Sequence, residues 1–121
     1  MAVERANRLS PGDEPLTPLV TRLLGESEGP IVAVTDFMRA VPDQISRWVP
    51  EGRRYVSLGT DGYGRSDTRE SLRRFFETDA AHVEVAVLAA LAHEGAVDPA
   101  VVLKAAADHG IDRDVEPSWV R

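Results

Sequence analysis

Two short apolar segments separated by a helical stretch constrain the fold of this chain most. Ile31-Val32-Ala33-Val34 is a continuous apolar run, and Tyr55 to Leu58 is a second candidate strand. A continuous apolar run is typical of a parallel strand that is covered on both faces. Between them, apolar residues recur at helical spacing from Met38 to Val49, and Pro42 requires that this helix start late or kink. The order strand, helix, strand predicts a right-handed βαβ unit and the α/β class.

Further helices are indicated on both sides of this unit by apolar spacing, by capping residues and by glycine stops. Asp36 is expected to cap the helix between the strands. The other expected helices are 16–24 with Gly25 as its stop, 67–76 with Asp67 and Glu70 as a capping box, 79–94 capped by Asp79, and 99–109 capped by Asp98.

The chain divides into an N-terminal segment and one domain. Residues 1–15 are rich in charge, proline and glycine without a clear period, and are predicted to be a flexible arm or linker. Residues 16–121 are predicted to be the domain. Because a sheet of two strands is a thin platform for so many helices, we expect this domain to lack its first strands.

Composition excludes several classes of function. The 121 residues contain no cysteine, which rules out disulfides and thiolate chemistry. The net charge of −6 opposes general binding to nucleic acid. The absence of disulfides fits a cytoplasmic location. No apolar run is long enough for a membrane span or a signal peptide, so no membrane contact is expected.

A longer segment carries a family resemblance. Residues 56–73, with the sequence VSLGTDGYGRSDTRESLR, closely resemble the C-terminal region of bacterial homodimeric pyruvate dehydrogenase E1. The flanking segments 33–38, 48–50, 75–81 and 94–98 match at the expected distances, so the resemblance is colinear over about residues 16–115. It implies a partial three-layer α/β sandwich of the transketolase C-terminal type, with a short parallel sheet and several helices.

The resemblance also implies cofactors and partners for the whole enzyme. Enzymes of this family use thiamine diphosphate and magnesium to decarboxylate pyruvate, and they acetylate the lipoyl group of the E2 acyltransferase. Their diphosphate site needs Gly-Asp-Gly followed by Asn-Asn, whereas Asn7 is the only asparagine here and Gly12-Asp13-Glu14 lacks the second glycine. We therefore expect no catalytic residue and no bound cofactor or metal in this chain. Its expected role is assembly with the remaining E1 domains, a second E1 chain and E2.

The segment of strongest resemblance includes a glycine-bearing loop between a strand and a helix. This family-signature loop consists of Gly59, Thr60, Asp61, Gly62, Tyr63, Gly64, Arg65, Ser66 and Asp67. Loops at such places can hold phosphate. The carboxylates of Asp67 and Glu70 would repel a phosphate at the start of the next helix, so a tight turn is favoured.

An arginine cluster follows the loop and leaves an alternative function open. Arg65, Arg69 and Arg73 are candidates for contact with an anion or an acidic partner, because guanidinium groups fit carboxylates. The chain would then be a stand-alone α/β interaction or regulatory module that binds an acidic ligand or partner through residues 60–74. A solvated helix face with pairs to Glu70, Glu77 or Asp61 is the favoured interpretation.

Two metal hypotheses are weaker. Asp36 and Asp61 both follow strands and could hold magnesium as in a receiver domain, although Asp36 is better explained as a helix cap. His82, His93 and His109 are spaced 11 and 16 residues apart, which matches no compact metal motif.

Overall fold

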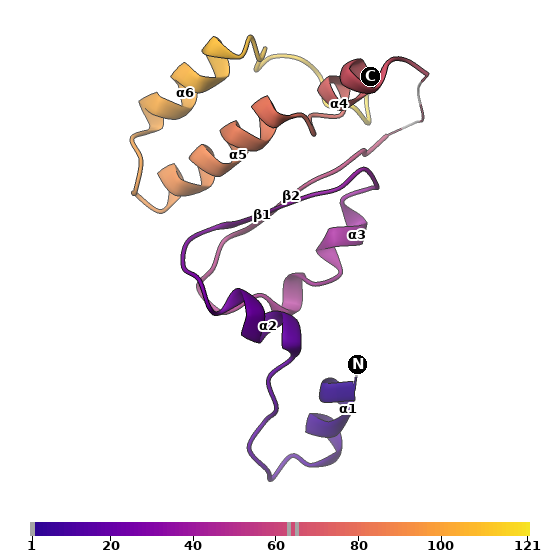
Figure 1. The fold of residues 1–121 in the computed structure, drawn as a ribbon, viewed down its shortest axis with the longest axis vertical. Helices are drawn as coiled ribbons and strands as arrows, with labels where there is room; N and C mark the ends of the chain where they lie inside the picture. Colours follow the sequence, from indigo (N-terminus) through magenta and orange to yellow (C-terminus); the bar gives the residue numbers. More distant parts are fainter. Residues whose placement is uncertain (1, 63, 65) are drawn as a thin grey trace.

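The computed structural model describes residues 2–62, 64 and 66–121. Figure 1 shows an elongated molecule whose helices and strands follow the chain from one end to the other. The elements are α1 (Ala2–Leu9), α2 (Leu19–Leu24), β1 (Ile31–Val34), α3 (Ala40–Asp43), the 3-10 helix η1 (Ser46–Trp48), β2 (Tyr55–Leu58), α4 (Arg69–Phe75), α5 (Ala80–His93) and α6 (Pro99–Asp108).

The two predicted strands form a parallel pair. Ile31 is opposite Tyr55 and Val34 is opposite Leu58, so the strands pair along their whole length without a bulge. This confirms the short parallel sheet and the α/β class that the apolar runs predicted. Among the described residues the sheet has two strands.

Helices lie on both faces of this sheet. On one face, the hydroxyl of Tyr55 donates to the carbonyl of Pro42 at 2.6 Å, and Ser57 Oγ donates to Asp43 at 2.6 Å. These two side chains point to the same face because alternate strand residues do so. Helix α5 packs against both strands, and α6 lies alongside α5 (Figure 1). The order of layers is therefore α3, sheet, α5 and then α6.

The segment after β1 differs from the sequence prediction. Asp36 does not cap a helix, because α3 begins only at Ala40 with Arg39 as its N-cap residue. Thr35 Oγ1 instead accepts the backbone N–H of Phe37 at 3.1 Å, which forms a local turn. Pro42 lies in the first turn of α3, where a missing N–H costs nothing. The helix thus starts late, and the chain continues as a 3-10 turn.

The start of α4 is displaced by one residue from its prediction. The N-cap is Thr68, whose Oγ1 accepts the N–H of Ser71 at 3.2 Å, so the expected capping box of Asp67 and Glu70 is wrong. Asp67 Oδ1 accepts the N–H of Thr68 and thereby supports the cap from outside the helix. The caps predicted for Asp79 and Asp98 are confirmed.

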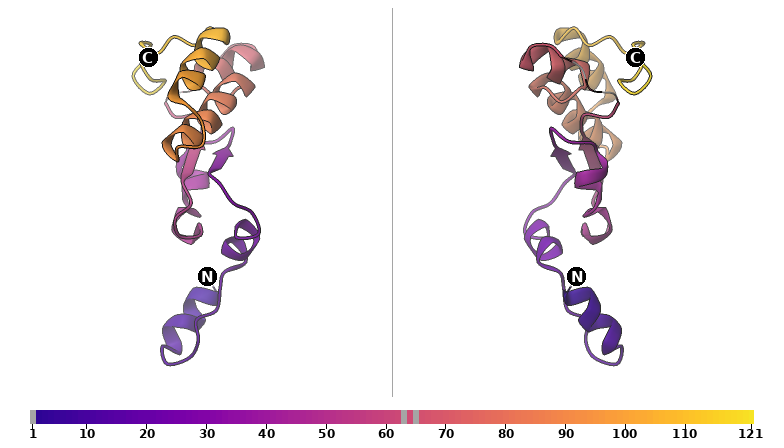
Figure 2. Two further views of the ribbon diagram at one scale, coloured as in Figure 1. Left: turned by 90° about the vertical axis from the view of Figure 1, so that its left-hand side faces the viewer. Right: turned by 90° about the vertical axis from the view of Figure 1, so that its right-hand side faces the viewer.

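Near the N-terminus, Ala2–Leu9 form a helix that the aperiodic sequence did not indicate. Asn7 holds it by exchanging two hydrogen bonds with the backbone of Leu16, at 2.9 and 2.8 Å. Figure 2 shows α1 at the end of the molecule opposite to α5 and α6. Helix α2 starts later than predicted, at Leu19, because the residue before Pro18 is disfavoured in a helix.

The hydrophobic core of this chain is small. Among the described residues, the apolar side chains that are buried are Ala90 at 2% exposure and Ala106 at 6%, and no large side chain is fully buried. The strand residues are half-buried except Val34, which is exposed at 45%. The expectation that both faces of the strands are fully covered is therefore not met within this chain. In the part of the chain that the structure describes, no helix is long and apolar enough to cross a bilayer.

Candidate functional site

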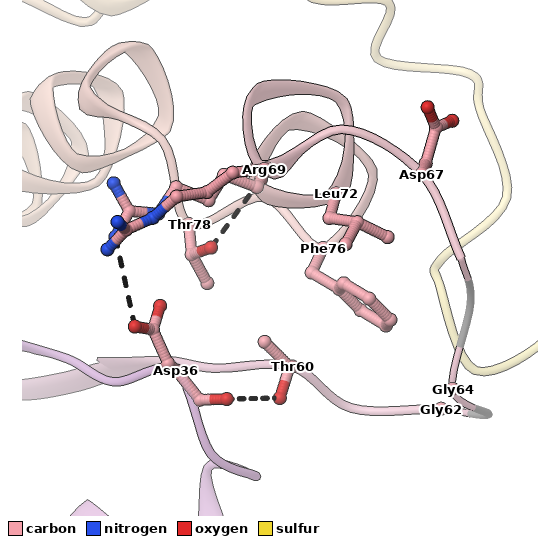
Figure 3. A pocket seen from close by; sticks show the side chains of 10 residues that line it. Asp36, Thr60, Gly62, Gly64, Asp67, Arg69, Leu72, Phe76 and Thr78 are labelled. Atoms are coloured by element: carbon pink, nitrogen blue, oxygen red, sulfur yellow. Dashed lines mark hydrogen bonds and ion pairs between the residues drawn. The ribbon is translucent and has the colours of Figure 1, made fainter.

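A cleft of about 450 Å³ opens where the two parallel strands end. The segments after β1 and β2 form its base and α4 forms its wall (Figure 3). Ligand sites of open α/β sheets occur at this carboxyl edge of the strands. The lining residues are Asp36, Thr60, Gly62, Gly64, Asp67, Arg69, Leu72, Arg73, Phe76 and Thr78.

Helix α4 presents one face to this cleft. Arg69, Leu72, Arg73 and Phe76 lie at i, i+3, i+4 and i+7, which is the spacing of a single helical face. In Figure 3 the side chains of Leu72 in α4 and of Phe76, the residue that follows α4, project into the middle of the cleft. The guanidinium of Arg69 lies at the end near Asp36, and Asp67 lies at the opposite rim. The cleft therefore has a cationic end and an apolar middle.

The charges at the cationic end are only loosely paired. Arg73 Nη2 lies 3.8 Å from Asp36 Oδ2; the side chain of Arg73 is 41% exposed and that of Asp36 is 68% exposed. Arg69 makes no ion pair or side-chain hydrogen bond with another described residue. A separation of 3.8 Å is longer than a charge-assisted hydrogen bond, so this pair contributes little.

Two threonines fix the base of the cleft. Thr60 Oγ1 donates to the carbonyl of Asp36 at 2.9 Å, and the N–H of Thr60 donates to the carbonyl of Phe37 at 2.8 Å. These bonds continue the pairing of β1 with β2 beyond the strands. Thr78 is buried at 8% exposure, and its N–H donates to the carbonyl of Arg73 at 2.9 Å. The base and the wall are thus held by hydrogen bonds to backbone carbonyls.

The side chain of Asp61 contacts Arg39 and is not among the residues that line the cleft. Its carboxylate accepts the backbone N–H of Arg39 at 2.9 Å and the Nε of Arg39 at 2.5 Å. Burial by itself raises the pKa of Asp61, but the two hydrogen bonds and the positive charge of Arg39 outweigh it, so the pKa is lowered. Asp61 is therefore a structural carboxylate at neutral pH.

The C-terminal residues close over the same loop. Ser118 is buried, and its Oγ donates to the carbonyl of Asp61 at 2.5 Å. The guanidinium of Arg39 lies 5.1 Å from the ring centroid of Trp119. Arg121 donates to the carbonyl of Phe75 at 2.8 Å. The last residues thus tie the loop after β2 to the end of α4.

The family-signature loop is divided between these two roles. Thr60, Gly62, Gly64 and Asp67 line the cleft, whereas Asp61 turns toward Arg39. Gly59 is buried and Ser66 is exposed outside the cleft lining. The predicted residues Tyr63 and Arg65 lie outside the described residues.

The arginine cluster is also divided. Arg69 and Arg73 meet in the cleft, whereas Arg74 turns away to Asp79 at 3.2 Å and to the carbonyl of His109 at 2.6 Å. Sequence reasoning did not assign Leu72, Phe76 and Thr78 to the site. The first two share the i, i+3, i+4, i+7 face with the arginines, and this signal would have found them.

The Asp, Glu and His side chains of the described residues are not arranged to bind a metal or the cofactor. Among the described residues, no group of three His, Asp or Glu side chains is arranged to hold a metal ion. Asp36 lies 3.8 Å from Arg73 and Asp61 is bonded to Arg39, so each carboxylate faces a different arginine. His82 bonds Asp79 and His109 bonds Glu84, each at 2.6 Å. The residues present therefore do not fit the diphosphate and magnesium of thiamine diphosphate.

The fold and the cleft define a partial α/β domain with a short parallel sheet of two strands and several helices. Residues 14–79 match the family described as transketolase-like TK C-terminal domain, and the chain belongs to this family.

Curated proteins similar to this chain include pyruvate dehydrogenase E1 components of several bacteria. The pyruvate dehydrogenase E1 component of Mycolicibacterium smegmatis is 52% identical over 121 residues, or 99% of this chain. The corresponding proteins of Pseudomonas aeruginosa and Escherichia coli K12 are 50% and 44% identical over 93% and 92% of the chain. The chain spans 12–13% of the length of these three relatives.

Proposed function

We propose that this chain is the C-terminal assembly domain of a pyruvate dehydrogenase E1 subunit. In the whole enzyme, thiamine diphosphate and magnesium would be held by the other domains, pyruvate would be decarboxylated there, and the acetyl group would pass to the lipoyl arm of E2. The identity to E1 components over nearly the whole chain supports this role. A cytoplasmic location is part of the same proposal.

The exposed apolar surface is the observation that carries the proposal. Phe37 is 69% exposed, Met38 57% and Leu19 58%. A monomeric soluble domain rarely leaves so many large apolar side chains in water when its own core is this small. Neighbouring domains that cover these residues would complete both the sheet and the core.

The cleft does not support catalysis by this chain alone. It offers two guanidinium groups, two hydroxyls and two carboxylates, without a base that touches a nucleophile. Because the donors do not fit the diphosphate, we assign no reaction step to these residues. The contribution to the reaction would be indirect, through the assembly of the subunit.

A chimeric enzyme tests this function. The segment of the M. smegmatis E1 component that matches this chain would be replaced by residues 1–121, and the deletion of that segment would be the reference. We expect the chimera to be dimeric and to reduce an artificial electron acceptor with pyruvate, whereas the deletion variant should be inactive. A soluble, dimeric chimera without activity would contradict the proposal.

A pair of variants tests whether the activity of the chimera depends on the folding of the inserted residues. Ala90→Asp places a charge where the side chain is 2% exposed, and it should abolish the activity of the chimera. The equivalent change at exposed Ala89 should leave the activity intact. Equal loss for both variants would show that the chimera responds to any change at this helix.

A further inference from the structure

The arginines of the cleft are not neutralised by the partners that the sequence offered. Asp61 is bound by Arg39, and neither Glu70 nor Glu77 forms an ion pair with Arg69 or Arg73 among the described residues. One carboxylate, that of Asp36, lies 3.8 Å from Arg73. Two guanidinium groups one helical turn apart thus retain most of their donors for another acceptor.

Apolar surface adjoins these donors. Leu72 and Phe76 come from the same face of α4 and project into the cleft between the arginine end and the rim at Asp67 (Figure 3). Water covers this surface when the cleft is empty, at a free-energy cost that grows with the apolar area. An inorganic anion bound in the cleft would leave the side chains of Leu72 and Phe76 exposed to water.

We propose that this cleft binds a small organic anion, whose single carboxylate pairs with Arg69 and Arg73 and whose apolar body covers Leu72 and Phe76. A volume of about 450 Å³ is within the range of small-molecule sites. Arginine is suited to this task because its planar fork can donate two parallel hydrogen bonds to a carboxylate. The proposal does not depend on the function in an E1 subunit.

The neighbouring carboxylates decide between classes of anion. Asp36 lies at the arginine end and Asp67 at the opposite rim, so the site has acidic groups at both ends. These groups disfavour a doubly charged phosphate more than a singly charged carboxylate. A monocarboxylate with an aliphatic or aromatic body is therefore the class that the charge and the apolar lining favour together.

Asp36 has a defined part in this site. Its Oδ2 lies 3.8 Å from Arg73, which is a loose ion pair. Its backbone carbonyl accepts a hydrogen bond from Thr60. An incoming carboxylate would take the place of the Asp36 side chain at the guanidinium. Removal of the Asp36 charge should therefore strengthen binding, which is the opposite of the effect of an arginine substitution.

Titration of the complete, isotopically labelled 121-residue chain with hexanoate, followed by ¹H–¹⁵N correlation spectra, tests the proposal. Inorganic phosphate tests the charge alone and 1-hexanol tests the apolar part alone. We expect saturable shifts at Thr60, Leu72 and Thr78 with hexanoate and at most weak shifts with the other two. Phosphate or 1-hexanol binding as tightly as hexanoate would overturn the proposal, and so would the absence of saturable shifts in a well-dispersed spectrum.

Variants assign the interaction to residues. Arg69→Gln and Arg73→Gln should each weaken hexanoate binding by about tenfold, because each removes a charge-assisted hydrogen bond. Asp36→Asn should strengthen it several-fold, and Arg22→Gln on exposed α2 should leave it unchanged. Hexanoate affinity that is unchanged in both cleft arginine variants would overturn the assignment. The same titration on the dimeric chimera gives an independent reading if the chain alone is poorly folded.

Discussion

Arg39 and Asp61 join the segments that leave the two strands. The N–H of Arg39 donates to Asp61 Oδ1 at 2.9 Å and its Nε donates to Oδ2 at 2.5 Å, across 22 positions of sequence. The same guanidinium lies over the ring of Trp119. One side chain therefore connects the exit of β1, the exit of β2 and the C-terminal residues.

Replacement of Asp61 by Asn should lower the free energy of unfolding by about 1 kcal/mol, because it removes one charge from a partly exposed pair and keeps one acceptor. The Arg39 side chain is 44% exposed and that of Asp61 22%, which limits the effect. Urea denaturation measures it. Asp13→Asn, in an exposed loop, is the control. Identical urea midpoints for Asp61→Asn and the wild type would show that this pair adds no stability.

Acid should unfold the chain partly through Asp61 and Asp79. Burial raises the pKa of Asp79, but hydrogen bonds from His82 and Arg74 outweigh it, so the pKa of each carboxyl lies below its usual 3.8. A lowered folded pKa means that the unfolded chain binds protons first as the pH falls. The stabilisation is therefore complete above about pH 5 and is lost as the pH falls through the folded pKa values.

Thermal unfolding between pH 7 and pH 2 measures this loss. Asp61→Asn and Asp79→Asn should each make the melting temperature fall less steeply below about pH 4. Asparagine still caps a helix, so Asp79→Asn removes the charge without removing the cap. Wild-type steepness in both variants would contradict the assignment of the acid response to these two carboxyls.

Gly59→Ala should destabilise the chain by about 1–3 kcal/mol, as overpacking does in a rigid site. A Cβ at Gly59 would lie 2.6 Å from the carbonyl oxygen of Phe37 and 2.8 Å from the nitrogen of Arg39. Both are backbone atoms of the segment after β1, and both are held by hydrogen bonds: the carbonyl of Phe37 accepts the N–H of Thr60, and the N–H of Arg39 donates to Asp61. Chemical denaturation measures the effect.

Gly64→Ala is the matched control for this change, because a Cβ there meets no atom of the described residues within 4 Å. Its stability should stay within about 0.5 kcal/mol of the wild type. Similar losses at both positions would show that the loop resists any side chain, and that the close approach at Gly59 is not the cause.

Local signals were sufficient for several elements of this fold. The strands were predicted from continuous apolar runs, and the helices α5 and α6 from Asp79 and Asp98, because a cap bonds an amide two or three residues away. The cap of α4 was misplaced by one residue. Asp67 and Thr68 can both cap, and only backbone geometry decides between them.

Non-local contacts set the limit of the sequence prediction. The pairing of Asp61 with Arg39 follows from the meeting of two strand ends and not from a spacing along the chain. It also determined which arginines remain for the cleft, because Asp61 was one of their expected partners. The missing Asp36 cap has a different, local origin in the turn at Thr35. The sequence identified Arg69 and Arg73, but not the partners that compete for them.

The contact of α5 with α6 and the sheet gives the last prediction. Ala90 is the most buried apolar residue of the described chain, at 2% exposure, in the helix that packs on both strands and on α6. Its small side chain permits this close packing, so Ala90→Leu should cost about 1–3 kcal/mol of unfolding free energy. Ala89→Leu, on the exposed side of α5, should change it by less than about 0.5 kcal/mol. A stabilising Ala90→Leu would mean that space remains between these layers. The small core would then reflect loose packing within the chain, and the need for neighbouring domains would rest on the exposed residues around α2 and α3 alone.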